Sequence, residues 1–248
     1  MIIWYYVGIS FSHQQLIGRT LYNKKEIALP IQYCALACNP QPEDHIQEIK
    51  KNSVVYGIIK NNIIIIRSTS NCEDMKLTLE TSMKHTKYAD FHKGYYNRAE
   101  IIYNILTTEN KFKDVLNNEK IYLIGHSMGG AVGSILGYLL NYNLGRKIYG
   151  ITFGSPKFAT KEYLDYMKEN GINLVHYLNY LDPIIYKPTS RKLVRCGKEI
   201  YNTQDTGSLF NNHSLRVYSD LYNGIPSKII KKPSFIDLIG ECIFDIIL

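Results

Sequence analysis

A serine set among glycines carries the sharpest chemical signal in this sequence. The hexapeptide Gly125-His126-Ser127-Met128-Gly129-Gly130 fits the pattern G-x-S-x-G, with an apolar run before it and a long apolar run after it. A serine on a very tight strand-to-helix turn needs neighbours without bulky side chains two positions away on either side, which explains the two outer glycines. The helix that follows would direct free N–H groups toward developing negative charge. The motif therefore predicts that Ser127 is a nucleophile.

A serine hydroxyl is a poor nucleophile by itself, so a histidine and an orienting carboxylate must come from elsewhere in the chain. Where this turn occurs, the chain order is serine, acid, histidine. Asp182 follows a predicted strand, and the carboxyl ends of sheet strands are where such sites are built. His213 is the only histidine after Asp182. We therefore predict a catalytic triad of Ser127, Asp182 and His213.

The other histidines and carboxylates have structural interpretations. His126, inside the motif, fits a packed neighbour better than a catalytic base, and His176 lies in the middle of a predicted strand. Asp165 and Asp220 fit solvated helix charges, and Asp205 lies in a polar loop. The choice of His213 therefore depends on elimination as well as on its local pattern.

Short β-branched runs alternate with helical patterns and must position these residues. Val54–Ile59 and Ile63–Ile66 flank Asn61-Asn62, which tolerates the positive φ of a tight turn, so we expect a hairpin. Further strands are predicted at Ile121–Ile124, Ile148–Phe153 and Leu174–Leu178, and helices at Asn97–Leu106, Ala131–Leu140 and Glu162–Asn170, the last ending before Gly171. This alternation predicts a three-layer α/β fold with a parallel sheet. Since no repeat or linker is evident, residues 1–248 are expected to form one domain.

The two ends of the chain are apolar but short. Met1–Ser10 has no basic stretch and no small-residue cleavage site, and its Trp4-Tyr5-Tyr6 fits a first strand. Residues 235–248 are predicted to form an amphipathic helix that docks on the domain, with contact to lipid or a partner as the alternative. No window is long and apolar enough for a transmembrane segment.

Composition excludes several classes of protein. A hydrophobic content of 45% with 21% charged residues is typical of a globular chain, and five cysteines are too few for a disulfide framework. The net charge of +7 comes from scattered Lys and Arg, which argues against nucleic acid and leaves attraction to an anionic membrane as an alternative. Cys34 and Cys38 would lie close on a helix, but no second pair with metal-ligand spacing follows. We predict neither a metal nor an organic cofactor.

Taken in order, these motifs resemble those of the class 3, or fungal-type, lipases of the α/β-hydrolase superfamily. The resemblance covers roughly residues 30–220 and includes Arg67–Ser70, His92–Tyr95, Gly125–Ala131, Phe153–Pro156, Asn179–Pro183, Gly197–Glu199 (a family loop) and His213–Tyr218. It implies an α/β-hydrolase fold, with a mostly parallel central sheet flanked by helices and a nucleophile elbow after a central strand. It also implies an oxyanion hole, formed by the backbone N–H and hydroxyl of Thr69 and by the backbone N–H of Met128. Arg67 and His92 are expected to brace loops around the site.

The chain departs from the family pattern at several positions. Ser68 stands where the family usually has Gly, and Met75 and Thr78 stand where it has Trp and Asp. Arg195 replaces a frequent His, and the interval from Asp182 to His213 is short. No predicted catalytic group is lost, but the departures bear on the lid and on substrate range.

The resemblance implies serine-dependent hydrolysis of lipid esters, either acylglycerols or phospholipids, at a membrane or lipid-droplet surface. Cys72–Tyr88 is amphipathic and is expected to form a short cover over the site, or else an ordinary surface helix. A thioesterase or small-ester esterase, and an inactive module that binds lipid or a partner, are the alternatives. The sequon Asn212-His213-Ser214 would place a glycan beside His213, so an intracellular location, cytoplasmic or peripheral at membranes, is expected.

Overall fold

The computed structural model describes residues 24–38, 46–69, 80–203 and 205–222. Its central feature is a seven-stranded sheet with the order β1-β2-β3-β6-β7-β8-β9. The bounds of these strands are Gln47–Lys51 (β1), Val54–Lys60 (β2), Ile63–Ile66 (β3), Lys120–His126 (β6), Lys147–Phe153 (β7), Ile172–Asn179 (β8) and Lys198–Asn202 (β9). Within this sheet, β1–β2 and β2–β3 pair antiparallel, and every other neighbouring pair is parallel.

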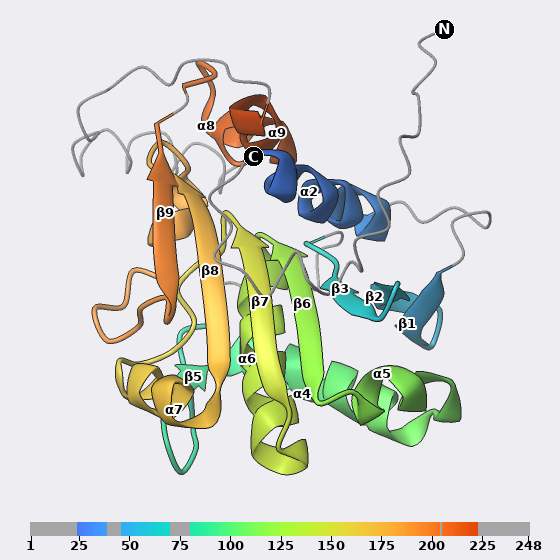
Figure 1. Ribbon diagram of the computed structural model, residues 1–248. Coiled ribbons are helices and arrows are strands. Elements are labelled where there is room, and N and C mark those ends of the chain that lie inside the picture. The colour runs from blue at the N-terminus through green and yellow to red at the C-terminus, as the bar shows by residue number, and fades with distance from the viewer. Residues whose placement is uncertain (1–23, 39–45, 70–79, 204, 223–248) are drawn as a thin grey trace, which may run out of the picture.

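Helices cover both faces of the sheet (Figure 1). Their bounds are Lys24–Cys38 (α2), Lys93–Thr108 (α4), Lys113–Asn117 (α5), Met128–Leu144 (α6), Glu162–Asn170 (α7), Leu209–Asn212 (α8) and Leu215–Tyr222 (α9), with short 3₁₀ turns at Asn110–Phe112 (η2) and Pro183–Tyr186 (η3). Residues of α4 to α7 share one hydrophobic cluster with the sheet, and residues of α2 and α9 share the other. The predicted three-layer α/β-hydrolase architecture is confirmed.

Burial on both faces explains why strand β3 is apolar at every position. Ile64 and Ile66 of β3 belong to the cluster beneath α4 and α6, whereas Ile63 and Ile65 belong to the cluster beneath α2 and α9. All four are at most 2% exposed. Successive side chains of a strand point to opposite faces, so a strand with both faces covered must be apolar at every position.

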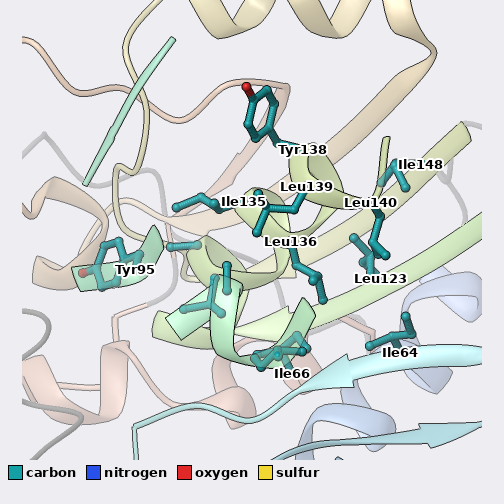
Figure 2. Close-up of a cluster of buried hydrophobic side chains, with 14 of the residues drawn as sticks. Ile64, Ile66, Tyr95, Leu123, Ile135, Leu136, Tyr138, Leu139, Leu140 and Ile148 are labelled. Atoms are coloured by element: carbon teal, nitrogen blue, oxygen red, sulfur yellow. The ribbon is translucent and has the colours of Figure 1, made fainter. Parts of the chain in front are cut away.

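Helix α6 is the central helix of the first cluster, and Figure 2 shows its side chains against the sheet. Ile135, Leu136 and Leu140 are fully buried, and they share the cluster with Leu123 of β6 and Ile148 of β7. The burial of nearly every residue from 128 to 141 fits the predicted helix, which had no polar face. Since α6 follows β6 directly, this packing holds the strand-to-helix turn rigidly.

The predicted hairpin and helix ends are also confirmed. Asn61 and Asn62 have φ of 51° and 62°, the left-handed values that a tight turn between β2 and β3 requires. Helix α7 ends at Gly171, whose φ of 72° gives a left-handed cap.

Four expectations need correction or lie outside the described residues. Residues 72–79 of the expected cover or surface helix at Cys72–Tyr88 lie outside the described residues. A helix is wrong over residues 83–85, because Met83–His85 (β4) pairs with Asp90–His92 (β5) in a two-stranded sheet. Lys198 and Glu199, expected in a loop, begin strand β9 because they extend the parallel ladder of β8. The predicted strand at Trp4-Tyr5-Tyr6 and the helix at 235–248 lie outside the described residues, and among those described no helix is long and apolar enough to cross a membrane.

Candidate active site

Ser127 lies on the turn that joins β6 to α6 and has a strained backbone. Its φ of 55° and ψ of −131° fall in a region that residues other than glycine rarely occupy, at a cost of about 1–3 kcal/mol. The strain is held by the surroundings: the N–H of Ser127 donates to the carbonyl of Phe153 at 2.9 Å, and its own carbonyl accepts from Gly130 N–H at 2.9 Å. The turn thereby presents the hydroxyl at the carboxyl end of a central strand.

The two outer glycines of the motif are required by close backbone contacts. A Cβ added at Gly125 would lie 2.3 Å from the carbonyl oxygen of Gly129, and a Cβ added at Gly129 would lie 2.4 Å from the carbonyl oxygen of Ile66. The first contact closes the turn, and the second brings the end of β3 against the first turn of α6. The spacing of the motif is therefore a steric requirement of this turn.

Ser127, His213 and Asp182 are joined by two short hydrogen bonds. The Ser127 hydroxyl lies 2.7 Å from Nε2 of His213, and Nδ1 of His213 lies 2.7 Å from Oδ2 of Asp182. An Nδ1–H that donates to the carboxylate leaves Nε2 as acceptor for the serine hydroxyl. The arrangement can therefore move a proton from the serine to the imidazole.

Asp182 is fully buried at the end of β8. Its Oδ1 accepts from the N–H of Ile184 at 2.8 Å and so caps η3, while Oδ2 faces His213. The buried ring of Tyr218 lies nearby, where burial and then the negative charge of Asp182 raise the pKa of the phenol. The phenol of Tyr218 therefore stays neutral at this site.

His213 lies between α8 and α9, and its loop is tied to the sheet from two sides. Nδ2 of Asn179 donates to the carbonyl of Asn212 at 3.1 Å, and Nε2 of His126 lies 2.8 Å from the carbonyl oxygen of His213. The rings of His126 and His213 are stacked, with centroids 4.8 Å apart. Burial lowers the pKa of His126 to about 3, so this imidazole is neutral and donates Nε2–H to the carbonyl. His126 thus packs against His213, as expected of a neighbour, and is not placed between it and the serine.

Of the two predicted oxyanion residues, Met128 lies on the serine turn, and Thr69 follows the strand end that contacts this turn. Met128 is the first residue of α6, and the first N–H groups of a helix have no intrahelical carbonyl partner. Thr69 is half-buried and lies three residues after the end of β3, in the segment whose start touches Gly129. Ser68 lies beside it, with its Oγ 3.4 Å from Sγ of Cys38 at the end of α2.

His176 and His92, which were predicted to have structural roles, are both buried and hydrogen-bonded. Nδ1 of His176 lies 2.6 Å from the Thr152 hydroxyl, and its Nε2 lies 3.0 Å from the carbonyl oxygen of Cys196. Burial lowers the pKa of His176 to about 4, so it is neutral. His92 caps α4, with Nδ1 accepting from Tyr95 N–H at 3.3 Å, and burial lowers its pKa as well.

The buried, charged side chain of Arg195 lies beside the site, although the sequence did not predict it as a site residue. Arg195 has a side chain only 6% exposed and pairs with Glu199, Nε to Oε1, at 3.0 Å. The sole signal in the sequence was that this position departs from the family pattern. Among the described residues, no group of three or more His, Cys, Asp or Glu side chains gathers to hold a metal ion.

The sheet order, the flanking helices and the strained turn define a protein of the α/β-hydrolase class. Residues 63–191, more than half of the chain, match the model of the Lipase (class 3) family. The chain therefore belongs to the class 3 lipase family. No curated protein matches the sequence.

Several solved structures share the fold. A triacylglycerol lipase from Penicillium expansum matches with a TM-score of 0.57 and 13% identity, over 73% of this chain and 79% of that one. The Rhizomucor miehei triacylglyceride lipase gives a TM-score of 0.56 and 18% identity, over 78% of this chain and 93% of that one. The Lip2 lipase of Yarrowia lipolytica gives 0.54 and 13%, over 71% and 77%. At these identities the likeness concerns the fold.

Proposed function

We propose that this protein is a serine hydrolase that cleaves carboxylic esters of lipids through an acyl-enzyme. The observation that carries the proposal is the unbroken line of hydrogen bonds from Ser127 through His213 to the buried Asp182, each 2.7 Å long. Membership of the class 3 lipase family supports the ester as the bond and a lipid as the substrate class. Acylglycerols and the acyl chains of phospholipids both fit this chemistry.

In the first half of the reaction, Ser127 attacks the ester carbonyl carbon while His213 Nε2 takes the hydroxyl proton. The carboxylate of Asp182 holds the imidazole in the tautomer that leaves Nε2 free, and it stabilises the imidazolium that forms. His213 then gives the proton to the leaving alcohol, and the acyl group remains on Ser127. Water repeats the sequence in the second half and releases the fatty acid.

The oxyanion that forms in each half needs donors beside Ser127. We assign this role to the backbone N–H of Met128 and to the backbone N–H and hydroxyl of Thr69. The assignment is supported by the position of Met128 at the start of α6 and by the contact of Gly129 with the strand end that leads to Thr69. Loss of one such donor typically costs about 3–4 kcal/mol of transition-state stabilisation.

Hydrolysis of p-nitrophenyl esters from acetate to palmitate tests the proposal. Ser127→Ala should lose turnover while nearly keeping the wild-type unfolding temperature, because the hydroxyl bonds to His213 in the site and not to a group of the hydrophobic core. Ser134→Ala is the matched control: Ser134 is also buried on α6, where its hydroxyl donates to the carbonyl of Gly130 at 2.8 Å. This variant should keep its activity.

The chain-length profile separates the proposed lipid ester hydrolase from an esterase for small esters. Turnover that rises toward palmitate, and is absent from Ser127→Ala, supports a lipase. Turnover confined to acetate contradicts the lipid substrate, and full activity in Ser127→Ala contradicts the nucleophile. Background rates from both proteins, together with binding to lipid vesicles, would instead identify an inactive lipid-binding module.

We also propose that the protein acts inside the cell, as a soluble or peripheral enzyme. Asn212 of the sequon is only 4% exposed, and its Oδ1 accepts from the N–H and the hydroxyl of Thr206, each at 2.8 Å. A glycan is joined to the amide nitrogen of asparagine, and so buried a side chain leaves no room for one beside His213. Fluorescence microscopy of the tagged protein in its own cell tests the location.

A further inference from the structure

The guanidinium of Arg195 joins the segments that follow β7 and β8 to strand β9. Its Nη1 donates to the carbonyl of Ile185 in η3 and, at 3.4 Å, to the carbonyl of Ser155 after β7. Its Nε donates to Glu199 in β9 at 3.0 Å, and Nη2 donates to the hydroxyl of Tyr201 at 3.3 Å. One buried side chain therefore links strand β9 to the segments that follow the two neighbouring parallel strands.

Two of these segments hold the acid of the site. Ile185 lies in η3, the turn capped by Asp182 through the 2.8 Å bond from Ile184 N–H to Oδ1. Ser155 follows Gly154, where an added Cβ would lie 2.9 Å from Oδ2 of Asp182. The guanidinium thus fixes the backbone on both sides of the carboxylate without touching the carboxylate itself.

A buried charge is costly unless it is paired and its donors are satisfied. Glu199 supplies the pairing, and the hydroxyl of Tyr201 donates in turn to the second oxygen of Glu199. A lysine would place one point charge here and could not reach two carbonyls, a carboxylate and a hydroxyl together. The contact set therefore specifically suits an arginine.

We propose that Arg195 is a positioning residue, which holds Asp182 in line with His213 through the backbone of η3 and of the segment after β7. The inference rests on the proposed function, since it concerns the same hydrolytic site. Without the guanidinium, η3 loses its tie to β9, and the hydrogen bond from His213 Nδ1 to Asp182 loosens. The imidazole of His213 is then less well oriented, whereas the binding of substrate is unchanged.

The test compares Arg195→Met with Arg98→Met. Arg98 of α4 is a matched control because it is also a buried arginine, 7% exposed. Its guanidinium carbon lies 4.1 Å from the ring centroid of Tyr56 in β2. We expect Arg195→Met to lower kcat by about 10- to 100-fold with KM within about twofold of wild type. Arg195→Lys should recover part of kcat, and Arg98→Met should keep both constants.

A proton NMR spectrum supplies a readout that needs no substrate. The downfield resonance of the proton between His213 Nδ1 and Asp182, identified by its loss in Asp182→Asn, should persist in wild type and Arg98→Met and disappear in Arg195→Met. Wild-type kcat and an intact resonance in Arg195→Met would overturn the inference. If Arg195→Met does not fold, Glu199→Gln decides, because it weakens the same clamp and should lower kcat in the same direction. If the wild-type protein hydrolyses no ester, the proposed function fails, while the resonance still tells whether Arg195 positions Asp182.

Discussion

His176 makes the stability of this fold sensitive to acid, with a magnitude that follows from its burial. The imidazole is 0% exposed, and burial lowers its pKa from the ordinary 6.5 to about 4. Between these values the unfolded chain binds a proton that the folded chain does not, so the free energy of unfolding decreases as the pH falls from 6.5 toward 4. The slope is about 1.4 kcal/mol per pH unit, and the loss between pH 7 and pH 5 is about 2 kcal/mol.

His176→Gln removes the titrating ring, and Thr152→Val is its matched control. The valine variant removes the hydroxyl that lies 2.6 Å from Nδ1 but leaves the buried imidazole in place. We therefore expect both variants to be less stable than wild type at pH 7, because each loses the hydrogen bond between Thr152 and His176. Only His176→Gln should show the weaker dependence on pH, by about 2 kcal/mol between pH 7 and pH 5.

Urea denaturation at a series of pH values measures these differences. Wild type and Thr152→Val should give parallel curves of unfolding free energy against pH, and His176→Gln a flatter one. A curve for His176→Gln that runs parallel to wild type would refute the reasoning, because the proton uptake would then occur elsewhere. His126, whose pKa burial lowers to about 3, should contribute a second loss of similar size in all three proteins.

Three further predictions concern the site itself. Asp182→Asn should lower kcat by about 10⁴-fold, because the amide favours the wrong tautomer of His213, and an unchanged rate in a p-nitrophenyl ester assay would place the acid elsewhere. Gly125→Ala should destabilise the protein by more than about 1 kcal/mol, since the new Cβ would lie 2.3 Å from the Gly129 carbonyl oxygen, and a wild-type unfolding temperature would contradict that contact. His126→Phe should keep the stacked ring but lose the 2.8 Å hydrogen bond to the His213 carbonyl, lowering kcat more than KM; equal kcat for wild type and variant would show that the bond does not steady the base.

Local sequence determined the central part of the fold. Strands β3, β6, β7 and β8 are buried on both faces, and continuous apolar runs therefore predicted each of them within a few residues. Helix α7 has the bounds that its pattern and Gly171 predicted. In these elements the period of the side chains and the capping residue carry the information, and both are local.

The edge strands of the sheet could not be predicted from an apolar pattern. Strand β1 reads QEIKK, with only Ile49 buried, and β9 reads KEIYN, with no fully buried residue. Such edge strands form because a neighbouring strand offers unpaired backbone groups, and their own side chains need not be apolar. Helix α2 carries Pro30 in its interior, a residue that argues against a helix when the sequence is considered alone.

The sequence by itself predicted which three residues form the candidate triad, because the serine turn has a steric signature and the expected chain order leaves one histidine after Asp182. Only the tertiary structure decided how they meet. The 2.7 Å contacts join Ser127 to His213 and His213 to Asp182 across the ends of separate elements. The supports of that geometry, the ring of His126 and the guanidinium of Arg195, act through backbone carbonyls far away in the chain. Every residue has a backbone carbonyl, whatever its type, so contacts to carbonyls leave no pattern in a sequence. They exist only once the sheet has formed.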